Sequence, residues 1–196
     1  MSEAVVFEGL PGCGKTSLIN LLASELNVTK IPEILDQGKL WGEAKETENQ
    51  DFFWLNDVSK MRLAKNSTEV ALVDRGYAST LAYNYARTAI DKTNDYQRML
   101  DKYYEDIVEN NLTADLYIYV DTPIESAFVR KDRKVEKGNP WRDPTYLKGI
   151  ITFYEMFFTE MERCTPTIRL GRTLSLEQLV KELEHKIVRL LNYDQK

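Results

Sequence analysis

One short segment near the N-terminus limits what this chain can fold into more than any other feature. Residues 9–16 read Gly-Leu-Pro-Gly-Cys-Gly-Lys-Thr and fit the pattern G-x-x-x-x-G-K-[ST]. An apolar run, residues 4–8, precedes the segment, and residues 15–26 follow it with leucines at helical spacing. This order of strand, glycine-rich loop and helix predicts a loop whose backbone N–H groups surround phosphate oxygens at a helix N-terminus. A chance glycine-rich turn is the alternative, and the flanking strand and helix argue against it.

The residues of this loop have distinct expected roles in binding a nucleotide. Glycines allow tight turns that aim backbone N–H groups inward. Lys15 would place its charge between the terminal phosphates of ATP, and the hydroxyl of Thr16 would ligate the accompanying Mg²⁺. Cys13 is interpreted as a small residue that fills the loop, not as a nucleophile. The expected nucleotide-binding residues of this segment are Gly9, Pro11, Gly12, Cys13, Gly14, Lys15, Thr16 and Ser17.

Short apolar runs alternate with helical patterns along the whole chain. The runs that predict strands are residues 4–8, 28–32, 70–73, 116–120 and 167–170. The helices expected between them include residues 51–65, with Phe52, Leu55, Val58 and Met61 or Arg62 along one face, and residues 95–110. This alternation predicts a three-layer α/β/α architecture, the P-loop NTPase fold, with a five-stranded parallel sheet. Because no repeat or flexible linker divides the chain, we expect a single domain over residues 1–196.

Composition narrows the class of partner. The chain has 31 acidic and 26 basic residues and a formal net charge of −5, which disfavours general binding to nucleic acid or anionic membranes. Its two cysteines, Cys13 and Cys164, lie far apart, so that a disulfide scaffold or a cysteine metal site is not expected. No stretch resembles a signal peptide or approaches the roughly 20 apolar residues of a membrane span. These observations predict a cytoplasmic protein without a membrane or nucleic-acid partner.

An acid and an arginine follow the buried strand expected at residues 70–73. Asp74 would lie at the carboxyl end of that strand, where ligands bind in open α/β sheets, and could hold Mg²⁺. The alternative is an aspartate that caps the helix beginning near Tyr77. Arg75 could grip a phosphate or carboxylate through two hydrogen bonds, or it could be a structural partner of Glu33 or another acid.

Three segments resemble the thymidylate kinase and deoxynucleoside kinase group. They are residues 74–83 (DRGYASTLAY), residues 6–9 (VFEG) and residues 115–123 (DLYIYVDTP). The resemblance implies transfer of the γ-phosphoryl group of ATP to a small-molecule acceptor, a nucleoside or nucleoside monophosphate. A homodimer is a further possibility, since the group is often dimeric.

The same resemblance implies a small arginine-rich lid over about residues 124–145. Arg130 and Arg133 match that lid in position and would stabilise charge on the moving phosphoryl group. A solvated helix face with many charges is the alternative. Arg172 lies in the loop before the last helix, where kinases of this group often contact adenine.

The chain also departs from the pattern of that group. Pro11 stands where the thymidylate kinase loop usually has an acid, and Val58 stands where an arginine usually contacts the acceptor's phosphate, with Lys60 and Arg62 nearby. An acceptor that already carries a phosphate is therefore not assured. Glu33 lies in a Pro-Glu pair that resembles, in reverse order, the Glu-Pro segment whose glutamate acts as a base on the accepting hydroxyl. An ordinary loop glutamate is the alternative.

Aromatic residues populate the two helices that flank the acceptor in this group, and most of them would be core. They are Phe52, Phe53, Trp54, Tyr77, Tyr83 and Tyr85. One or two of them are expected to touch the substrate.

Two other functions remain open from the sequence. One is a kinase for another hydroxylated small molecule, such as an antibiotic or a sugar, and the other is a nucleotide-hydrolysing switch. Residues 121–124 (DTPI) do not supply the Asn-Lys-x-Asp segment of a GTPase switch. Arg75 occupies the place where a motor ATPase needs a second acid to activate water, which favours transfer over hydrolysis.

Overall fold

A computed structural model describes residues 2–35, 50–92, 95–131, 143–171 and 176–190. Its strands are β1 (Ala4–Gly9), β2 (Thr29–Ile31), β3 (Ala71–Asp74), β4 (Leu116–Val120) and β5 (Thr167–Leu170). All pairings between them are parallel, and their spatial order is β2-β3-β1-β4-β5. The predicted five-stranded parallel sheet is confirmed. Because β1 is the central strand, the loop that follows it leaves the sheet at the middle of its carboxyl edge.

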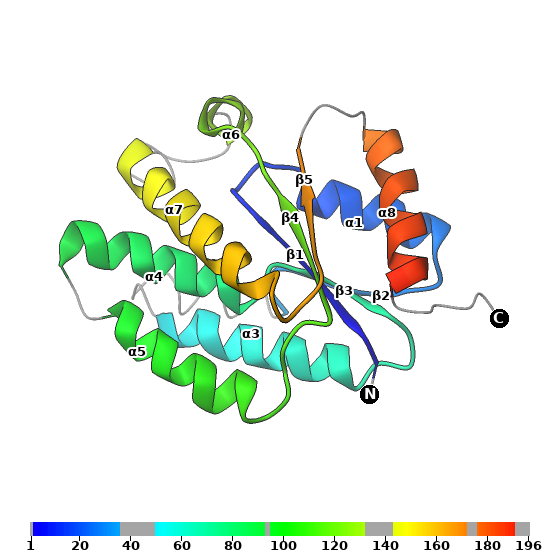
Figure 1. The fold of residues 1–196 in the computed structure, drawn as a ribbon, viewed down its shortest axis with the longest axis horizontal. Helices are drawn as coiled ribbons and strands as arrows, with labels where there is room; N and C mark the ends of the chain where they lie inside the picture. The colour runs from blue at the N-terminus through cyan, green and yellow to red at the C-terminus, as the bar shows by residue number, and fades with distance from the viewer. Residues whose placement is uncertain (1, 36–49, 93–94, 132–142, 172–175, 191–196) are drawn as a thin grey trace.

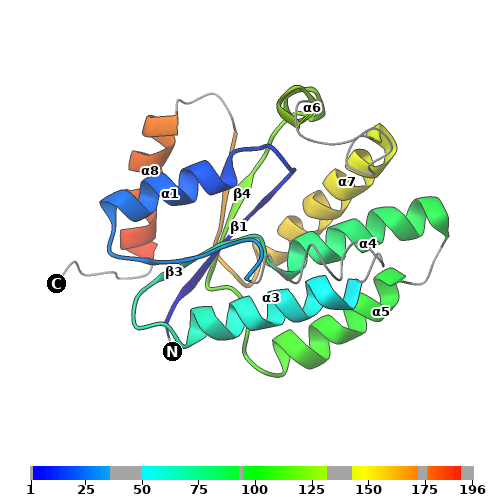
Figure 2. The same cartoon turned by 180° about the vertical axis from the view of Figure 1, so that it is seen from behind.

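Helices cover both faces of the sheet and complete the predicted three layers (Figure 1). They are α1 (Lys15–Glu25), α3 (Gln50–Lys65), α4 (Tyr77–Asp91), α5 (Asp95–Lys102), η1 (Tyr103–Val108), α6 (Ile124–Lys131), α7 (Pro144–Met161) and α8 (Leu176–Leu190). Helices α1 and α8 lie on one face, and α3, α4, α5 and α7 lie on the other, as the view from behind also shows (Figure 2). Within the described residues, no helix is both long enough and apolar enough to span a lipid bilayer.

The face that packs against α1 and α8 is almost entirely aliphatic. Successive strand residues point to opposite faces, so Val5 and Phe7 of β1 lie on this side. They pack with aliphatic side chains from both helices, such as Leu22 of α1 and Leu183 of α8, which are fully buried. We call this cluster the aliphatic layer.

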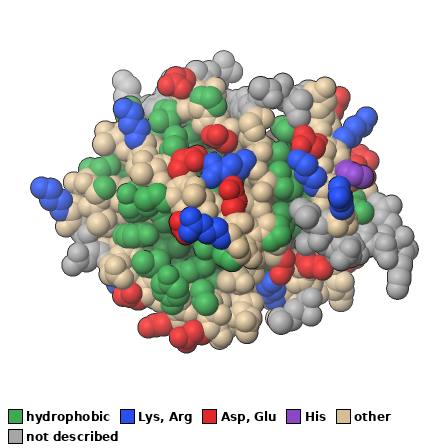
Figure 3. All heavy atoms as spheres, in the orientation of Figure 1, with side chains coloured by type: hydrophobic (Ala, Val, Ile, Leu, Met, Phe, Trp, Pro, Cys, Tyr) green, Lys and Arg blue, Asp and Glu red, His purple; other side chains and the backbone are tan. Residues whose placement is uncertain are grey.

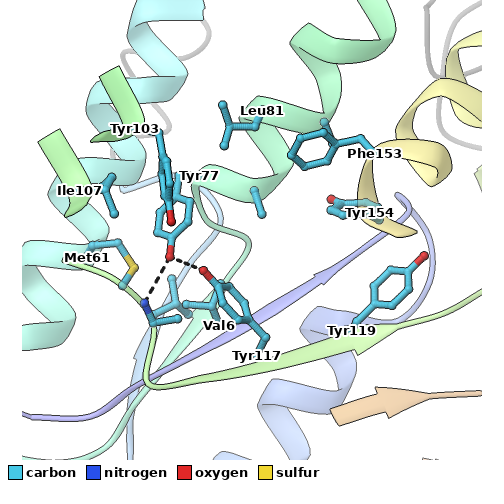
Figure 4. Close-up of a cluster of buried hydrophobic side chains, with 14 of the residues drawn as sticks. Val6, Met61, Tyr77, Leu81, Tyr103, Ile107, Tyr117, Tyr119, Phe153 and Tyr154 are labelled. Atoms are coloured by element: carbon cyan, nitrogen blue, oxygen red, sulfur yellow. Dashed lines mark hydrogen bonds between the residues drawn. The ribbon is translucent and has the colours of Figure 1, made fainter. Parts of the chain in front are cut away.

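The opposite face buries a cluster rich in tyrosine and phenylalanine, which we call the aromatic layer (Figure 4). The hydroxyls of Tyr77 in α4 and Tyr117 in β4 are hydrogen-bonded to each other, and the backbone N–H of Ala114 donates to the Tyr77 hydroxyl at 3.2 Å. Burial raises the pKa of Tyr77, so its phenol stays neutral. Phe153 and Tyr154 of α7 close this layer.

Two of the predicted helices differ from expectation in detail. The buried face of α3 is formed by Trp54, Val58, Met61 and Ala64, whereas Leu55, expected on that face, is 62% exposed. Val58 and Met61 are buried as predicted, but Trp54, four residues before Val58, lies on this face in place of Leu55, three residues before it. The single helix expected over residues 95–110 is an α-helix that continues as the short π-helix η1.

Candidate active site

The glycine-rich loop has the backbone geometry that its sequence predicts. Gly9, Gly12 and Gly14 all have positive φ angles of 139°, 78° and 98°, which other residues adopt only with strain. A Cβ atom at Gly9 would also lie 2.6 Å from the carbonyl oxygen of Val120 in β4. The loop leads directly into α1 at Lys15, so its N–H groups and the helix N-terminus face the same region.

The ammonium group of Lys15 is held inside this loop. Its Nζ donates to the carbonyl oxygens of Gly9 at 3.2 Å and Leu10 at 3.1 Å, and lies 3.4 Å from Cys13 Sγ. Lys15 and Cys13 are both buried, whereas Thr16 and Ser17 in the first turn of α1 are exposed. When a phosphate binds in the loop, Lys15 Nζ would give up these neutral partners and pair with the anionic phosphate oxygens.

The carboxylate of Asp74 lies beside Thr16, as the metal-site prediction requires. Thr16 Oγ1 donates to Asp74 Oδ2 at 2.5 Å. Asp74 is 4% exposed, and its Oδ1 has no hydrogen-bond partner among the described residues. A buried carboxylate oxygen of this kind needs a donor or a cation, and a carboxylate next to a hydroxyl fits Mg²⁺. The alternative role for Asp74 has no support in the geometry, because a different acid caps α4.

Arg75 joins three parts of the site. Its Nη1 donates to the Gly9 carbonyl oxygen at 2.9 Å and to Ser79 Oγ at 3.0 Å, and its Nε lies 2.8 Å from Glu33 Oε1. The residue is 8% exposed and has a φ of 62°, in the left-handed region. Burial alone would lower the pKa of this guanidinium, but Glu33 and other neighbouring groups raise it, so Arg75 stays charged. This ion pair matches the alternative stated for Arg75, a partner of Glu33, and it brings two candidate site residues together.

Glu8 is the acid that caps α4, a role that is not predicted from the sequence. Its Oε1 accepts from the backbone N–H groups of Gly76 at 2.9 Å and Ser79 at 3.3 Å. Its Oε2 accepts from the hydroxyl of Ser79 and from that of Tyr154 at 3.2 Å. Complete burial raises the pKa of Glu8 to about 7, although the bond from Ser79 and the charge of Arg75 oppose this shift. An acid inside an apolar strand was the signal available in the sequence.

The basic residues of α3 are not placed to meet a phosphate on the acceptor. Lys60 is 1% exposed, and its Nζ lies 2.8 Å from Asp57 Oδ1 and donates to the Arg75 carbonyl oxygen at 3.0 Å. Arg62 is exposed, and Val58 is part of the core. The position that would carry the phosphate-binding arginine is thus apolar and buried.

Several predicted residues fall elsewhere. Arg133 and Arg172 lie outside the described residues, and of Arg130 only its place in α6 is described. Trp54 and Tyr77 are core residues, and Trp54 Nε1 donates to Asp106 Oδ2 at 2.7 Å. The remaining aromatic candidates are half-buried: Phe52, Phe53, Tyr83 and Tyr85.

Known proteins share this fold. A deoxyadenosine kinase from M. mycoides with bound dATP is similar at 17% identity and a TM-score of 0.75, over 94% of this chain and 98% of that one. Its structure with the products dCMP and a flexible dCDP gives 16% identity and 0.74, and its structure with dCTP gives 15% and 0.75. Each of the latter two covers 95% of this chain and 99% of the other. No curated protein sequence matches this chain.

The solved structures establish the fold, and a family model establishes the family. The model described as deoxynucleoside kinase matches residues 5–192, which is nearly the whole chain. The predicted phosphotransferase is thereby confirmed, with a nucleoside as acceptor and a nucleotide as phosphate donor. The chain belongs to the deoxynucleoside kinase family.

Proposed function

We propose that this enzyme transfers the γ-phosphoryl group of ATP to the free 5′-hydroxyl of a deoxynucleoside, and not to a nucleoside monophosphate. The observation that carries the proposal is the ion pair between Arg75 Nε and Glu33 Oε1, 2.8 Å apart, directly beside the phosphate-binding loop. A carboxylate in this position can accept the proton of an attacking hydroxyl. Arg75 orients that carboxylate and adds positive charge near the reacting phosphate.

The proposed reaction is a direct displacement. The acceptor's hydroxyl oxygen attacks the γ-phosphorus, the bond from that phosphorus to the β–γ bridging oxygen breaks, and ADP leaves. Glu33 takes the hydroxyl proton, while the loop N–H groups and Lys15 offset the charge on the phosphates. Arg130 and Arg133 in the lid would add to this stabilisation, and Arg172 would contact adenine.

Mg²⁺ belongs to the proposal because Asp74 and Thr16 fit it. The unpaired Oδ1 of Asp74 and the hydroxyl of Thr16 would hold the ion, directly or through water. Such a site, with one carboxylate and few protein ligands, is typical of Mg²⁺ bound together with nucleotide phosphates. The ion would supply positive charge to the β- and γ-phosphate oxygens.

The residues of α3 support the proposal that the acceptor carries no phosphate. Lys60 is paired with Asp57 and donates to two backbone carbonyl groups. Val58, at the position expected for an arginine, is buried in the aromatic layer. An acceptor phosphate at this place would meet an apolar side chain, and burying an unpaired dianion there would be costly. A neutral nucleoside has no such cost.

The similar structures suggest which bases to test first. The M. mycoides enzyme is described with dATP and with deoxycytidine nucleotides bound. Adenine and cytosine each carry an exocyclic amino group beside a ring nitrogen acceptor. We propose deoxyadenosine and deoxycytidine as the first candidates for the acceptor.

A single cytoplasmic domain that forms a homodimer completes the proposal. Hydrophobic side chains gather over the half of the molecule occupied by α4, α5 and α7 in the orientation of Figure 1 (Figure 3). Met156 of α7, for example, is 45% exposed. Apolar surface of this kind is a common mark of an interface. Light scattering after size-exclusion chromatography tests the assembly.

The test of the function is release of ADP from ATP and Mg²⁺ with a panel of acceptors. We expect deoxyadenosine or deoxycytidine to raise ADP release at least about tenfold over water, and dAMP and dCMP to leave it unchanged. Monophosphates that react as fast as nucleosides would contradict the proposed acceptor. ADP release that no acceptor raises would favour hydrolysis, and a response only to sugars or hydroxylated antibiotics would favour the other kinase.

A further inference from the structure

We propose that Lys60 is a positioning residue, which holds the backbone turn that presents Asp74 and Arg75 to the substrates. Lys60 lies in α3, and its Nζ donates to the carbonyl oxygen of Arg75 at 3.0 Å and to that of Asp74 at 3.4 Å. The side chain is 1% exposed, so the ammonium is removed from water and does not itself reach the reacting atoms. The proposal rests on the roles proposed above for Asp74 and Arg75.

The turn at Asp74–Arg75 needs to be held because its backbone is strained. Arg75 has a φ of 62°, which is unfavourable for a residue with a Cβ atom. The Arg75 N–H still donates one hydrogen bond to the neighbouring strand, to the Phe7 carbonyl oxygen at 3.0 Å. Its two carbonyl groups converge on Lys60, and a cation at this point offsets the repulsion between their oxygens.

Lys60 is itself fixed by an acid on the same helix. Asp57 is 4% exposed, and its Oδ1 lies 2.8 Å from Lys60 Nζ, while its Oδ2 accepts from Thr80 Oγ1 of α4 at 2.6 Å. The three N–H donors of Lys60 thus match three acceptors, which are Asp57 and the two carbonyl groups of the turn. The network connects α3, the end of β3 and the first turn of α4.

The two side chains of this turn point to different parts of the site. Asp74 reaches Thr16 in α1, and Arg75 reaches Gly9 and Glu33. A small rotation of the turn would therefore displace the metal-binding acid and the base-orienting arginine at the same time. Misplacement of catalytic groups by even 1 Å can slow a reaction about 100-fold.

Stability alone does not account for this network. Buried ion pairs contribute little to stability compared with apolar residues of similar volume, because both charges must leave water. An apolar replacement would fill the space between α3 and β3, but it would leave the carbonyl groups of Asp74 and Arg75 without their shared donor. The ammonium therefore both satisfies these two carbonyl groups and fixes their direction, and an apolar side chain can do neither.

The test uses two pairs of substitutions in the full-length enzyme. Lys60→Met alone leaves the Asp57 charge buried and unpaired, and it serves only to measure the loss of stability. The double variant Lys60→Met/Asp57→Asn has no unpaired charge and keeps an acceptor for Thr80. The matched control is Lys65→Met/Asp115→Asn, since Lys65 is another poorly exposed lysine of α3, 2.6 Å from Asp115, at the opposite edge of the sheet.

We expect the Lys60→Met/Asp57→Asn enzyme to regain most of the thermal stability lost by Lys60→Met, yet to keep a kcat at least about tenfold below the parent, with KM for ATP within about twofold. The control pair should alter stability without changing kcat. A double variant with parental stability and parental kcat would overturn the proposal. Full activity of Arg75→Lys and Asp74→Asn would instead overturn the roles of that turn, and the positioning role of Lys60 with them.

Discussion

The two faces of the sheet bury different kinds of side chain. The aliphatic layer, between the sheet and α1 and α8, is built from residues such as Val5, Leu72 and Ile118. The opposite face buries the aromatic layer and, with it, several charged or polar groups: Glu8, Asp57, Lys60, Arg75, Thr80 and Asn84. One face therefore gains free energy simply by burial, whereas the other must pair every polar group that it removes from water.

This difference separates residues that stabilise the fold from residues that position the active site. Aliphatic packing stabilises the sheet whatever the ligand, because the hydrophobic effect is not directional. The polar groups on the other face each accept or donate a specific hydrogen bond: Glu8 accepts from the N–H of Gly76, and Asp57 accepts from the hydroxyl of Thr80. Such bonds fix the direction of a neighbour, and here the neighbours are the turn at Asp74–Arg75 and the start of α4. Substitutions in the two layers should therefore have different consequences.

The largest loss of activity is expected from a substitution in the phosphate-binding loop, which lies between the two layers. Lys15→Met should lower kcat/KM about 1,000-fold, because the loop loses the one charge that lies within it, while unfolding remains cooperative. Steady-state kinetics and thermal denaturation measure the two properties. The exposed Lys30, substituted in the same way, controls for the loss of a charge at the surface. Parental activity in Lys15→Met would remove the basis of the proposed mechanism.

Next in size is a substitution confined to the aliphatic layer. Leu183→Ala in α8 should lower the free energy of unfolding by about 3 kcal/mol, since Leu183 is fully buried and the space it leaves is not refilled. At temperatures where the variant is folded, its kcat and KM should equal those of the parent. Leu21→Ala is the control, because Leu21 in α1 is 37% exposed and should cost far less. A change in kcat would show that the aliphatic layer is not merely a scaffold.

Substitution of the proposed base, Glu33, should lower activity and leave stability almost unchanged. Glu33→Gln keeps a side-chain oxygen near Arg75 Nε but cannot take the proton of the acceptor, so kcat should fall about 100-fold with little change in stability. Glu33 is more than half exposed, which is why the free energy of unfolding should hardly change. Glu160→Gln, on the surface of α7, is the matched control. An unchanged kcat would return Glu33 to the status of an ordinary loop residue.

The sequence predicts the structure best at positions where only one structural role suits the residue type. The loop glycines, Lys15 and the apolar run before Asp74 specify a parallel sheet with a phosphate-binding loop, and the structure has both. Apolar periodicity predicted where the strands and helices lie. On the buried face of α3 it was wrong at one position, because Leu55 and Trp54 are both apolar and only Trp54 is buried. Periodicity alone does not separate two neighbouring hydrophobic residues when only one of them is buried.

Most contacts of the polar groups in the aromatic layer could not be predicted, because the partners are distant in sequence; the pair of Arg75 with Glu33, which was one stated alternative, is an exception. Glu8 bonds to Ser79 and Tyr154, which are 71 and 146 residues away. The spacing of Asp57 and Lys60 does indicate a pair on one helix, yet nothing in it says that the pair is buried under the turn at Arg75. Such arrangements follow from how the helices pack on the sheet.

The smallest effect we predict concerns the pH dependence of the polar face. The pKa of Glu8 rises from the ordinary 4.5 to about 7 in the folded protein, because burial disfavours the carboxylate. Between these two values the folded state binds more protons than the unfolded state, so this residue makes stability fall as pH rises. Above about pH 7 both states are ionised, and its contribution no longer changes. Arg75 and Asp57 are the charged groups that also act on Glu8.

Glu8→Gln removes this titration while keeping an oxygen for the N–H groups of Gly76 and Ser79. We expect the stability of the parent, relative to Glu8→Gln, to decline by about 2 kcal/mol from pH 5 to pH 8, as measured by urea unfolding at each pH. Glu25→Gln, at the exposed end of α1, is the control for the loss of a carboxylate at the surface. Parallel curves for the parent and Glu8→Gln would mean that the aromatic layer holds Glu8 as an ordinary carboxylate. If Glu8 is ionised at pH 5, its hydrogen bonds must offset the whole cost of burying its charge. The two faces of the sheet would then differ less in free energy than their compositions imply.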